Sequence, residues 1–314
     1  MSGRGGNQDS GRAVPADPGV GEEGLVVAHF GVAVDVRLAD GRDQSLRLRR
    51  RSGVVVGDRV WVSGSSFERL PRETVLRRRD VRGRVRAIAA NLDVLGIVVA
   101  PIPPWPAGYV DRGIVAARAA SIEPVLIANK CDLEGSQVLR ERLARVYSPS
   151  VPVFSLSAET GSGLQALRAF LSQGHRGAFI GTSGVGKSSL LNALVPGLAL
   201  EVGAINTFTR LGRHVTTNST LHRLIGGGEL IDTPGFRDFV PVELSQGDLS
   251  SYFSGFEAAL EESCRFRNCA HRNEPGCRVL EAVASGALAG ERHQAYLAIL
   301  ADLELAEERP RRRR

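Results

Sequence analysis

The chain has 314 residues, of which 43% are apolar and 24% charged, so it can bury a substantial core and form about two or three compact units. It contains no run of about 18 uncharged apolar residues, and residues 1–24 are polar and Gly-rich. We therefore expect no membrane span, no secretory signal and a cytoplasmic location. The formal net charge is +6, and residues 25–85 hold 14 Arg against 7 Asp or Glu. This excess favours polyanions such as RNA, although a solvated Arg-rich surface has the same composition.

Along the chain, residues 1–24 are expected to form a disordered arm and residues 25–85 a small RNA-binding β-barrel. Short strands are predicted at 25–30, 32–38, 45–49, 60–63 and 74–78. An oligonucleotide-binding (OB) fold is the leading candidate for such a barrel. Residues 86–240 alternate apolar strands with amphipathic helices, which predicts a parallel sheet covered by helices. Residues 241–305 are expected to form a helical domain with three cysteines, and residues 306–314 a basic tail.

Residues 181–188 fit the phosphate-binding P-loop pattern, between a predicted strand and a predicted helix. Backbone N–H groups of such a loop surround nucleotide phosphates, and the helix N-terminus adds positive potential. Lys187 is expected to contact the β- and γ-phosphates and to act in catalysis, and Ser188 to bind Mg²⁺. The expected nucleotide contacts here are Gly181, Thr182, Ser183, Gly184, Val185, Gly186, Lys187, Ser188 and Ser189.

The tetrapeptide Asn129-Lys130-Cys131-Asp132 follows a predicted strand, so it lies where a ligand meets the sheet. Asp132 can accept hydrogen bonds from N1–H and the 2-amino group of guanine, which adenine lacks, so the motif favours GTP over ATP. The stem of Lys130 would support the base. Of 40 basic residues only Lys130 and Lys187 are lysines, which agrees with a demand for a compact ammonium at both positions.

Two further motifs close predicted strands. Ser157-Ala158 would offer a backbone N–H to guanine O6. Asp232 would help to hold Mg²⁺, and Gly235 would donate its N–H to the γ-phosphate. In ordinary small GTPases the P-loop comes first, whereas here the base motifs precede it, which predicts a circularly permuted GTPase. The permutation is tolerated because the site depends on where strand ends lie. The segment after Gly235 leads directly into the Cys-bearing region.

The polar residues 210–218 are the expected first switch. Thr216 or Thr217 would bind Mg²⁺; the sequence leaves both open, and we favour Thr217. Phe236 stands where many GTPases have a water-orienting Gln, so intrinsic hydrolysis should be slow. His214 is the candidate to position the water, and a solvent-exposed loop histidine is the alternative.

Three thiolates and one imidazole occur within fourteen residues of the C-terminal region. They are Cys264, Cys269, His271 and Cys277. This closed set suits structural Zn²⁺ and leaves no open position for catalysis, whereas unpaired buried thiols are the alternative. The surrounding arginines would either contact phosphates or offset the charge of the site.

Together the motifs resemble the RsgA (YjeQ) family, bacterial GTPases of the circularly permuted class that depend on the small ribosomal subunit. The resemblance spans about residues 25–290 and includes Gly212-Arg213-His214-Val215-Thr216-Thr217, in which Val215 replaces the usual Thr. It implies a multidomain α/β protein with an N-terminal OB-fold barrel, a central permuted P-loop GTPase and a C-terminal helical zinc-binding domain. It also implies a catalytic role for His214.

The resemblance further implies binding to the 30S subunit during late maturation and release on GTP hydrolysis stimulated by that subunit. We also expect contact with 16S rRNA and a monomeric chain. Two other functions are alternatives to a GTPase that acts on the small ribosomal subunit. A GTP-gated RNA-binding module would turn over GTP only incidentally. A kinase-type P-loop ATPase is disfavoured by Asp132.

Overall fold

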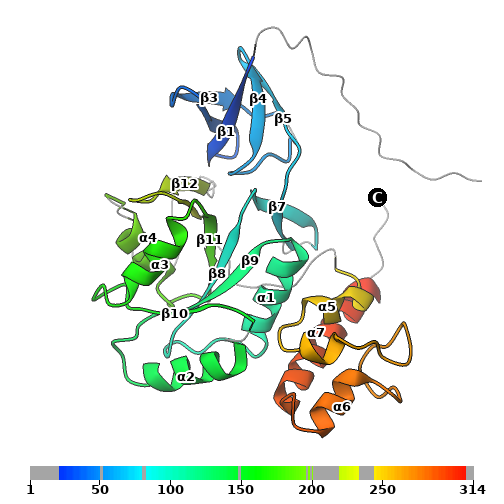
Figure 1. Cartoon of the computed structure of the whole chain (residues 1–314). Coiled ribbons are helices and arrows are strands. Elements are labelled where there is room, and N and C mark those ends of the chain that lie inside the picture. Colours follow the sequence, from blue (N-terminus) through cyan, green and yellow to red (C-terminus); the bar gives the residue numbers. More distant parts are fainter. Residues whose placement is uncertain are drawn as a thin grey trace, which may run out of the picture.

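The structure is a computed structural model, and it describes residues 21–49, 52–79, 83–147, 150–195, 197–198, 200, 219–232 and 244–308. Figure 1 shows three parts in chain order: a small group of strands, a larger sheet flanked by helices, and a helical C-terminal part. Among these residues no helix has the length and apolar character that a membrane crossing requires.

The first part is the expected barrel. Its strands are β1 (Glu22–His29), β2 (Ala33–Leu38), β3 (Asp43–Arg47), β4 (Arg59–Ser63) and β5 (Ser66–Arg69). They pair antiparallel in the order β3-β2-β1-β4-β5, and β3 contacts β5 to close the ring. The Gln44 side chain strengthens this closure by donating to the Gly64 carbonyl oxygen at 2.8 Å. Alternating valines such as Val34, Val36 and Val60 point inward and form the barrel core.

Two details of the barrel differ from the sequence prediction. The fifth strand is Ser66–Arg69, which is mostly exposed and lacks the apolar alternation that marks a strand. The barrel also begins earlier, because β1 starts at Glu22, inside the expected arm of residues 1–24. Residues 1–20 of that arm and the basic tail from residue 309 lie outside the described residues.

The strand expected at residues 74–78 belongs instead to a separate hairpin. This hairpin pairs β6 (Val75–Arg79) with β7 (Val85–Ala90). Leu76 and Ala89 are buried in the core of the larger sheet, and Ala89 also forms a parallel bridge with Val56 next to the barrel. The hairpin therefore connects the barrel to the larger sheet.

The larger sheet has the alternating strands and helices that the sequence predicts. Its strands are β8 (Val94–Val99), β9 (Glu123–Ala128), β10 (Val153–Ser155), β11 (Arg176–Ile180), β12 (Ser219–Arg223) and β13 (Glu229–Asp232). Its helices are α1 (Tyr109–Ala119), α2 (Ser136–Tyr147), α3 (Leu164–Leu171) and α4 (Lys187–Leu194). The order is β10-β9-β8-β11-β13-β12, and every pair is parallel except β12–β13. The buried central strand β8 is typical of a parallel sheet covered on both faces.

The larger sheet continues into the barrel at its β12 edge. Strand β1 pairs antiparallel with β12, so that Ala28 faces Thr220 and His29 faces Ser219. Barrel strands and the central strands thus belong to one hydrogen-bonded sheet.

Residues 244–308, which we call the C-terminal module, are helical as expected. Their elements are η1 (Gln246–Asp248), α5 (Leu249–Tyr252), η2 (Ala258–Leu260), α6 (Arg278–Ala284) and α7 (Gly290–Glu308). The buried side chains of Phe253, Phe256 and Tyr296 form the centre of the module, with Phe253 and Tyr296 in edge-to-face contact.

Candidate functional site

The phosphate loop joins β11 to α4, as the sequence predicts. Helix α4 begins at Lys187 after Gly186, whose φ of 94° favours glycine. The Lys187 ammonium donates hydrogen bonds to the carbonyl oxygens of Gly181 at 2.6 Å and Thr182 at 3.0 Å. It is therefore held at the loop where phosphates would enter. Thr182 Oγ1 is buried and has no hydrogen-bond partner among the described residues. Five other predicted contacts lie in the loop or the first turn of α4: Ser183, Gly184, Val185, Ser188 and Ser189.

Asn129 joins the base motif to two other motifs. Its side chain is 2% exposed, and its Nδ2 donates to the Val185 carbonyl oxygen of the phosphate loop at 2.8 Å. Its Oδ1 accepts a hydrogen bond from the Ala158 N–H at 3.1 Å. A Cβ at Gly186 would lie 2.3 Å from Asn129 Nδ2, so this position requires glycine. Three motifs that are distant in sequence thus meet at one amide.

Lys130 also contacts the phosphate loop. Its backbone is in the left-handed region with a φ of 63°, and its Nζ donates to the Gly184 carbonyl oxygen at 2.7 Å. The same Nζ donates to the Ile102 carbonyl oxygen at 2.8 Å. Asp132 is exposed at the end of this loop, where its carboxylate is accessible to a ligand. A compact ammonium that bridges two carbonyls explains why Lys130 is not arginine.

The Ser157-Ala158 motif lies in a tight turn after β10. Ser157 is fully buried, its N–H donates to the Ser162 carbonyl oxygen at 2.8 Å, and its Oγ accepts from the Thr160 N–H at 3.2 Å. These bonds fix the turn that presents Ala158 to Asn129.

Asp232 ends strand β13, directly opposite Thr220 on β12. Burial raises the pKa of its carboxyl group, and the charges of His222 and Lys187 oppose this rise. Strands β13 and β11 pair in parallel, so Asp232 and the phosphate loop follow their strands at the same end of the sheet. The predicted residues His214, Thr216, Thr217 and Gly235 lie outside the described residues.

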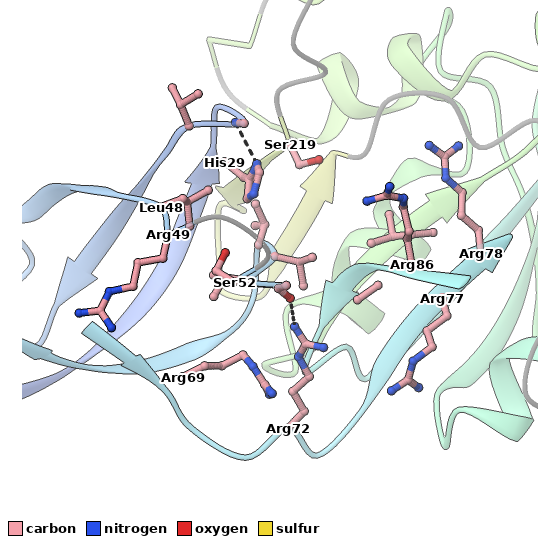
Figure 2. A pocket seen from close by; sticks show the side chains of 18 of the residues that line it. His29, Leu48, Arg49, Ser52, Arg69, Arg72, Arg77, Arg78, Arg86 and Ser219 are labelled. Atoms are coloured by element: carbon pink, nitrogen blue, oxygen red, sulfur yellow. Dashed lines mark hydrogen bonds between the residues drawn. The ribbon is translucent and has the colours of Figure 1, made fainter. Parts of the chain in front are cut away.

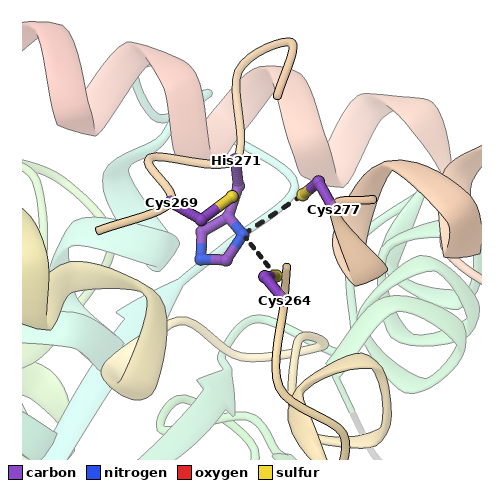
Figure 3. Close-up of side chains that lie close together, drawn as sticks. All are labelled: Cys264, Cys269, His271 and Cys277. Carbon is purple, nitrogen blue, oxygen red and sulfur yellow. Dashed lines mark hydrogen bonds between the residues drawn. The ribbon is translucent and has the colours of Figure 1, made fainter. Parts of the chain in front are cut away.

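The predicted zinc ligands Cys264, Cys269, His271 and Cys277 form one cluster (Figure 3). Their four ligand atoms lie within 4.8 Å of one another, and His271 Nδ1 is 3.3 Å from Cys277 Sγ and 3.6 Å from Cys264 Sγ. Burial, together with the nearby sulfurs of Cys277 and Cys264, raises the pKa of the Cys269 thiol to about 12. Such closely packed thiols favour a bound cation, and the three-sulfur, one-nitrogen set is compatible with one structural zinc.

Backbone contacts hold the loop that carries the cluster. The Glu274 carboxylate accepts hydrogen bonds from the N–H groups of Ala270 and Arg272, both at 2.8 Å. Burial acts to raise the pKa of Glu274, but these backbone donors lower it to about 2. His293 of α7 contacts the His271 carbonyl oxygen at 2.6 Å. The ligands therefore sit on a loop that side chains from outside the set hold in place.

An Arg-rich groove lies between the barrel and the β6–β7 hairpin (Figure 2). Its volume is about 980 Å³, and no Asp or Glu is among the described residues that line it. Seven arginines line it: Arg47, Arg49, Arg69, Arg72, Arg77, Arg78 and Arg86. Arg72 is neutralised by an ion pair with the fully buried Asp58 at 2.6 Å. His29 and Ser219 lie where β1 meets β12 and also line the groove. Six of the fourteen arginines of residues 25–85 thus line one concave surface.

Sequence reasoning missed the contacts between α1 and the C-terminal module. Arg292 of α7 forms a buried ion pair with Asp111 of α1. The partners are 181 positions apart, and no local pattern marks either of them.

The family described as RsgA GTPase matches residues 69–240. A protein of Azotobacter vinelandii named "Small ribosomal subunit biogenesis GTPase RsgA" is 42% identical over 301 residues, which cover 91% of this chain and 87% of that protein. A protein of the same name from Ectopseudomonas mendocina is 42% identical over 310 residues, covering 93% and 90%.

Two solved structures are similar over almost their whole length. The crystal structure of YjeQ from Thermotoga maritima has a TM-score of 0.73 and 30% identity, covering 91% of this chain and 99% of that one. The structure of YloQ, described as a circularly permuted GTPase, has a TM-score of 0.68 and 24% identity, covering 95% and 100%, and supports the fold. Its description agrees with the motif order found here. The chain therefore belongs to the RsgA GTPase family.

Proposed function

We propose that the chain binds GTP and hydrolyses it to GDP and phosphate where the P-loop meets the base motif. The observation that carries this proposal is the buried amide of Asn129, which bonds both Val185 of the P-loop and Ala158 of the second base motif. A nucleotide spanning phosphate and base sites needs this juxtaposition. The exposed Asp132 is the group that would select guanine.

The chemistry follows from the motif residues. Water attacks the γ-phosphorus, the bond to the β–γ bridging oxygen breaks, and Lys187 stabilises the charge on the phosphate oxygens. Ser188, Thr217 and Asp232 are proposed to hold Mg²⁺, which neutralises negative charge on those oxygens when bound. His214 is proposed to orient the attacking water, and the Gly235 N–H to contact the γ-phosphate. The zinc of the C-terminal module has a structural role.

We assign RNA binding to the barrel of residues 25–85, GTP hydrolysis to residues 86–240 and zinc binding to residues 241–305. The proposed partner is the small (30S) ribosomal subunit, through 16S rRNA, during its late maturation in the cytoplasm, with the chain acting as a monomer. Two observations support this partner: the names of the relatives, and the Arg-rich groove, which suits a phosphate backbone. The groove extends past the barrel, since Arg86 lies on β7.

The experiment compares GTP hydrolysis by the wild type and by His214→Ala, with and without purified 30S subunits. We expect strong stimulation of the wild type and loss of stimulation in His214→Ala, with GTP binding retained. Absence of stimulation in the wild type would favour the alternative, a GTP-gated RNA-binding module with incidental turnover. Tighter binding of ATP than GTP would contradict guanine selection by Asp132.

A further inference from the structure

Helix α1 lies between the larger sheet and the C-terminal module and contributes to both cores. Ile114 and Ala117 belong to the core of the sheet, whereas Val115 packs in the cluster that contains Phe253 and Tyr296. Figure 1 shows α1 facing α5 and α7. A shift of the C-terminal module is therefore opposed by apolar packing on α1.

A buried ion pair strengthens this contact. The side chains of Asp111 on α1 and Arg292 on α7 are each 6% exposed. The Arg292 guanidinium lies between two aromatic rings, 4.7 Å from the centre of Tyr147 and 4.6 Å from that of Phe253. A buried charge is tolerated when it is paired, and separating this pair would leave both charges without compensation. Separation of α1 from the C-terminal module is therefore energetically unfavourable.

Arg112, which follows Asp111 on α1, continues this connection towards the nucleotide site. Its Nε donates to Asp302 Oδ2 of α7 at 3.0 Å, and its Nη1 donates to the Ala107 carbonyl oxygen at 2.8 Å. Ala107 belongs to the loop of residues 101–108 that joins β8 to α1. One guanidinium thus joins the C-terminal module to this loop.

The other end of the same loop contacts the phosphate loop. The Ile102 carbonyl oxygen accepts a hydrogen bond from Lys130 Nζ, which also donates to the Gly184 carbonyl oxygen. The Pro103 ring is so close to Gly184 that a Cβ there would lie 3.4 Å from it. Residues 101–108 therefore connect Arg112, which contacts the C-terminal module, to the phosphate loop.

We propose that Arg112 is a positioning residue for guanine-nucleotide binding, because it holds the loop of residues 101–108 against the phosphate loop. Nucleotide affinity then depends on the Arg112–Asp302 contact, and by reciprocity bound nucleotide strengthens docking of the C-terminal module. The inference rests on the proposed GTP site. It adds a connection between the C-terminal module and the nucleotide site that is separate from the segment after Gly235.

The test measures the Kd and dissociation rate of a fluorescent GDP analogue with purified zinc-loaded protein. The variants are Arg112→Ala, Asp302→Ala and their double variant. The control is Arg118→Ala, because Arg118 also connects α1 to the module, through Glu257 at 2.8 Å. Its described hydrogen bonds go to Tyr252, Glu257 and Ser150, none of which lies in the loop. Arg112→Lys is included because a lysine lacks the planar fork that reaches two acceptors.

We expect Arg112→Ala and Asp302→Ala each to raise the Kd about 5- to 50-fold, mainly through faster dissociation. The double variant should bind the GDP analogue no more weakly than Arg112→Ala alone, because both substitutions break the same connection. Arg112→Lys should recover only part of the affinity, and Arg118→Ala should stay within about twofold of the wild type. A purely structural role of Arg112 would not produce this pattern.

Wild-type affinity in a folded, zinc-loaded Arg112→Ala variant would overturn the inference, as would an equal loss in Arg118→Ala. If Arg112→Ala does not fold, Asp302→Leu has a similar side-chain size but no acceptor for the Arg112 guanidinium. It gives the same readout, and an unchanged Kd would overturn the inference. Failure of the wild type to bind GDP or GTP would overturn the proposed function together with this inference. Normal wild-type binding with unaffected variants would overturn this inference alone.

Discussion

Replacement of Arg292 by methionine tests how strongly the C-terminal module is held on α1. Methionine fills much of the space but leaves the Asp111 carboxylate, 6% exposed, with the Tyr147 hydroxyl at 3.2 Å as its remaining side-chain partner. Breaking a buried pair in this way costs about 3–5 kcal/mol. The two ring contacts of Arg292 lie in the same buried region and are lost as well.

The assay is a urea titration in which zinc release is followed with a chromogenic chelator, because the zinc ligands share the core of the module. With slopes of about 1–3 kcal/mol/M, the expected loss lowers the midpoint by about 1 M or more. The double variant Asp111→Leu/Arg292→Met should have a midpoint closer to that of the wild type, because no buried charge remains unpaired.

The control for this prediction is Arg278→Met in the same module. Arg278 pairs with Glu281 at 2.8 Å and with Glu262 at 2.6 Å, but its side chain is 42% exposed, so each pair contributes about 0–1 kcal/mol. If Arg292→Met moved the midpoint no further than Arg278→Met, the argument that a buried pair locks the module onto α1 would be refuted.

Three further predictions concern the nucleotide site, the zinc site and the groove. Gly186→Ala should weaken GTP binding at least about tenfold in a fluorescent-nucleotide titration, because the new Cβ would meet Asn129 Nδ2 at 2.3 Å; unchanged affinity would contradict the bridging role of Asn129. Cys277→Ser should abolish stoichiometric zinc in metal analysis and lower the Tm, and full zinc occupancy would rule out the four-ligand assignment. Arg49→Ala should weaken binding to 16S rRNA and reduce the slope of log K against log salt by about 1, whereas an unaltered slope would show that Arg49 does not contact phosphate.

The nucleotide motifs could be predicted from sequence because each is a short strand-to-loop pattern. Residues 181–188 and 129–132 carry their structural context within about ten residues, so strand ends could be located and brought to one edge of a sheet. The zinc ligands were predictable for the same reason, because three thiolates and one imidazole lie within fourteen residues. All four meet in one cluster, as predicted.

Other features depend on tertiary contacts that local patterns do not encode. Strand β5 has exposed polar residues, and its pairing with β4 holds it in place more than any propensity of its own. The Asn129 amide has its role because β9 and the phosphate loop become neighbours only in the fold. The Asp111–Arg292 pair joins distant segments, and Arg86 enters the groove only because the β6–β7 hairpin folds beside the barrel.

The pairing of β1 with β12 also bears on solubility. Strand β12 would otherwise be the outer strand of the larger sheet, with open N–H and C=O groups near Ser219 and Thr220. Exposed strand edges can pair with other chains, so the barrel, by pairing with β12, opposes self-association of the larger sheet. A shortened protein that starts after the barrel would expose this edge of β12 to other molecules. Its aggregation would then result from the loss of the β1–β12 pairing, not from a failure to fold.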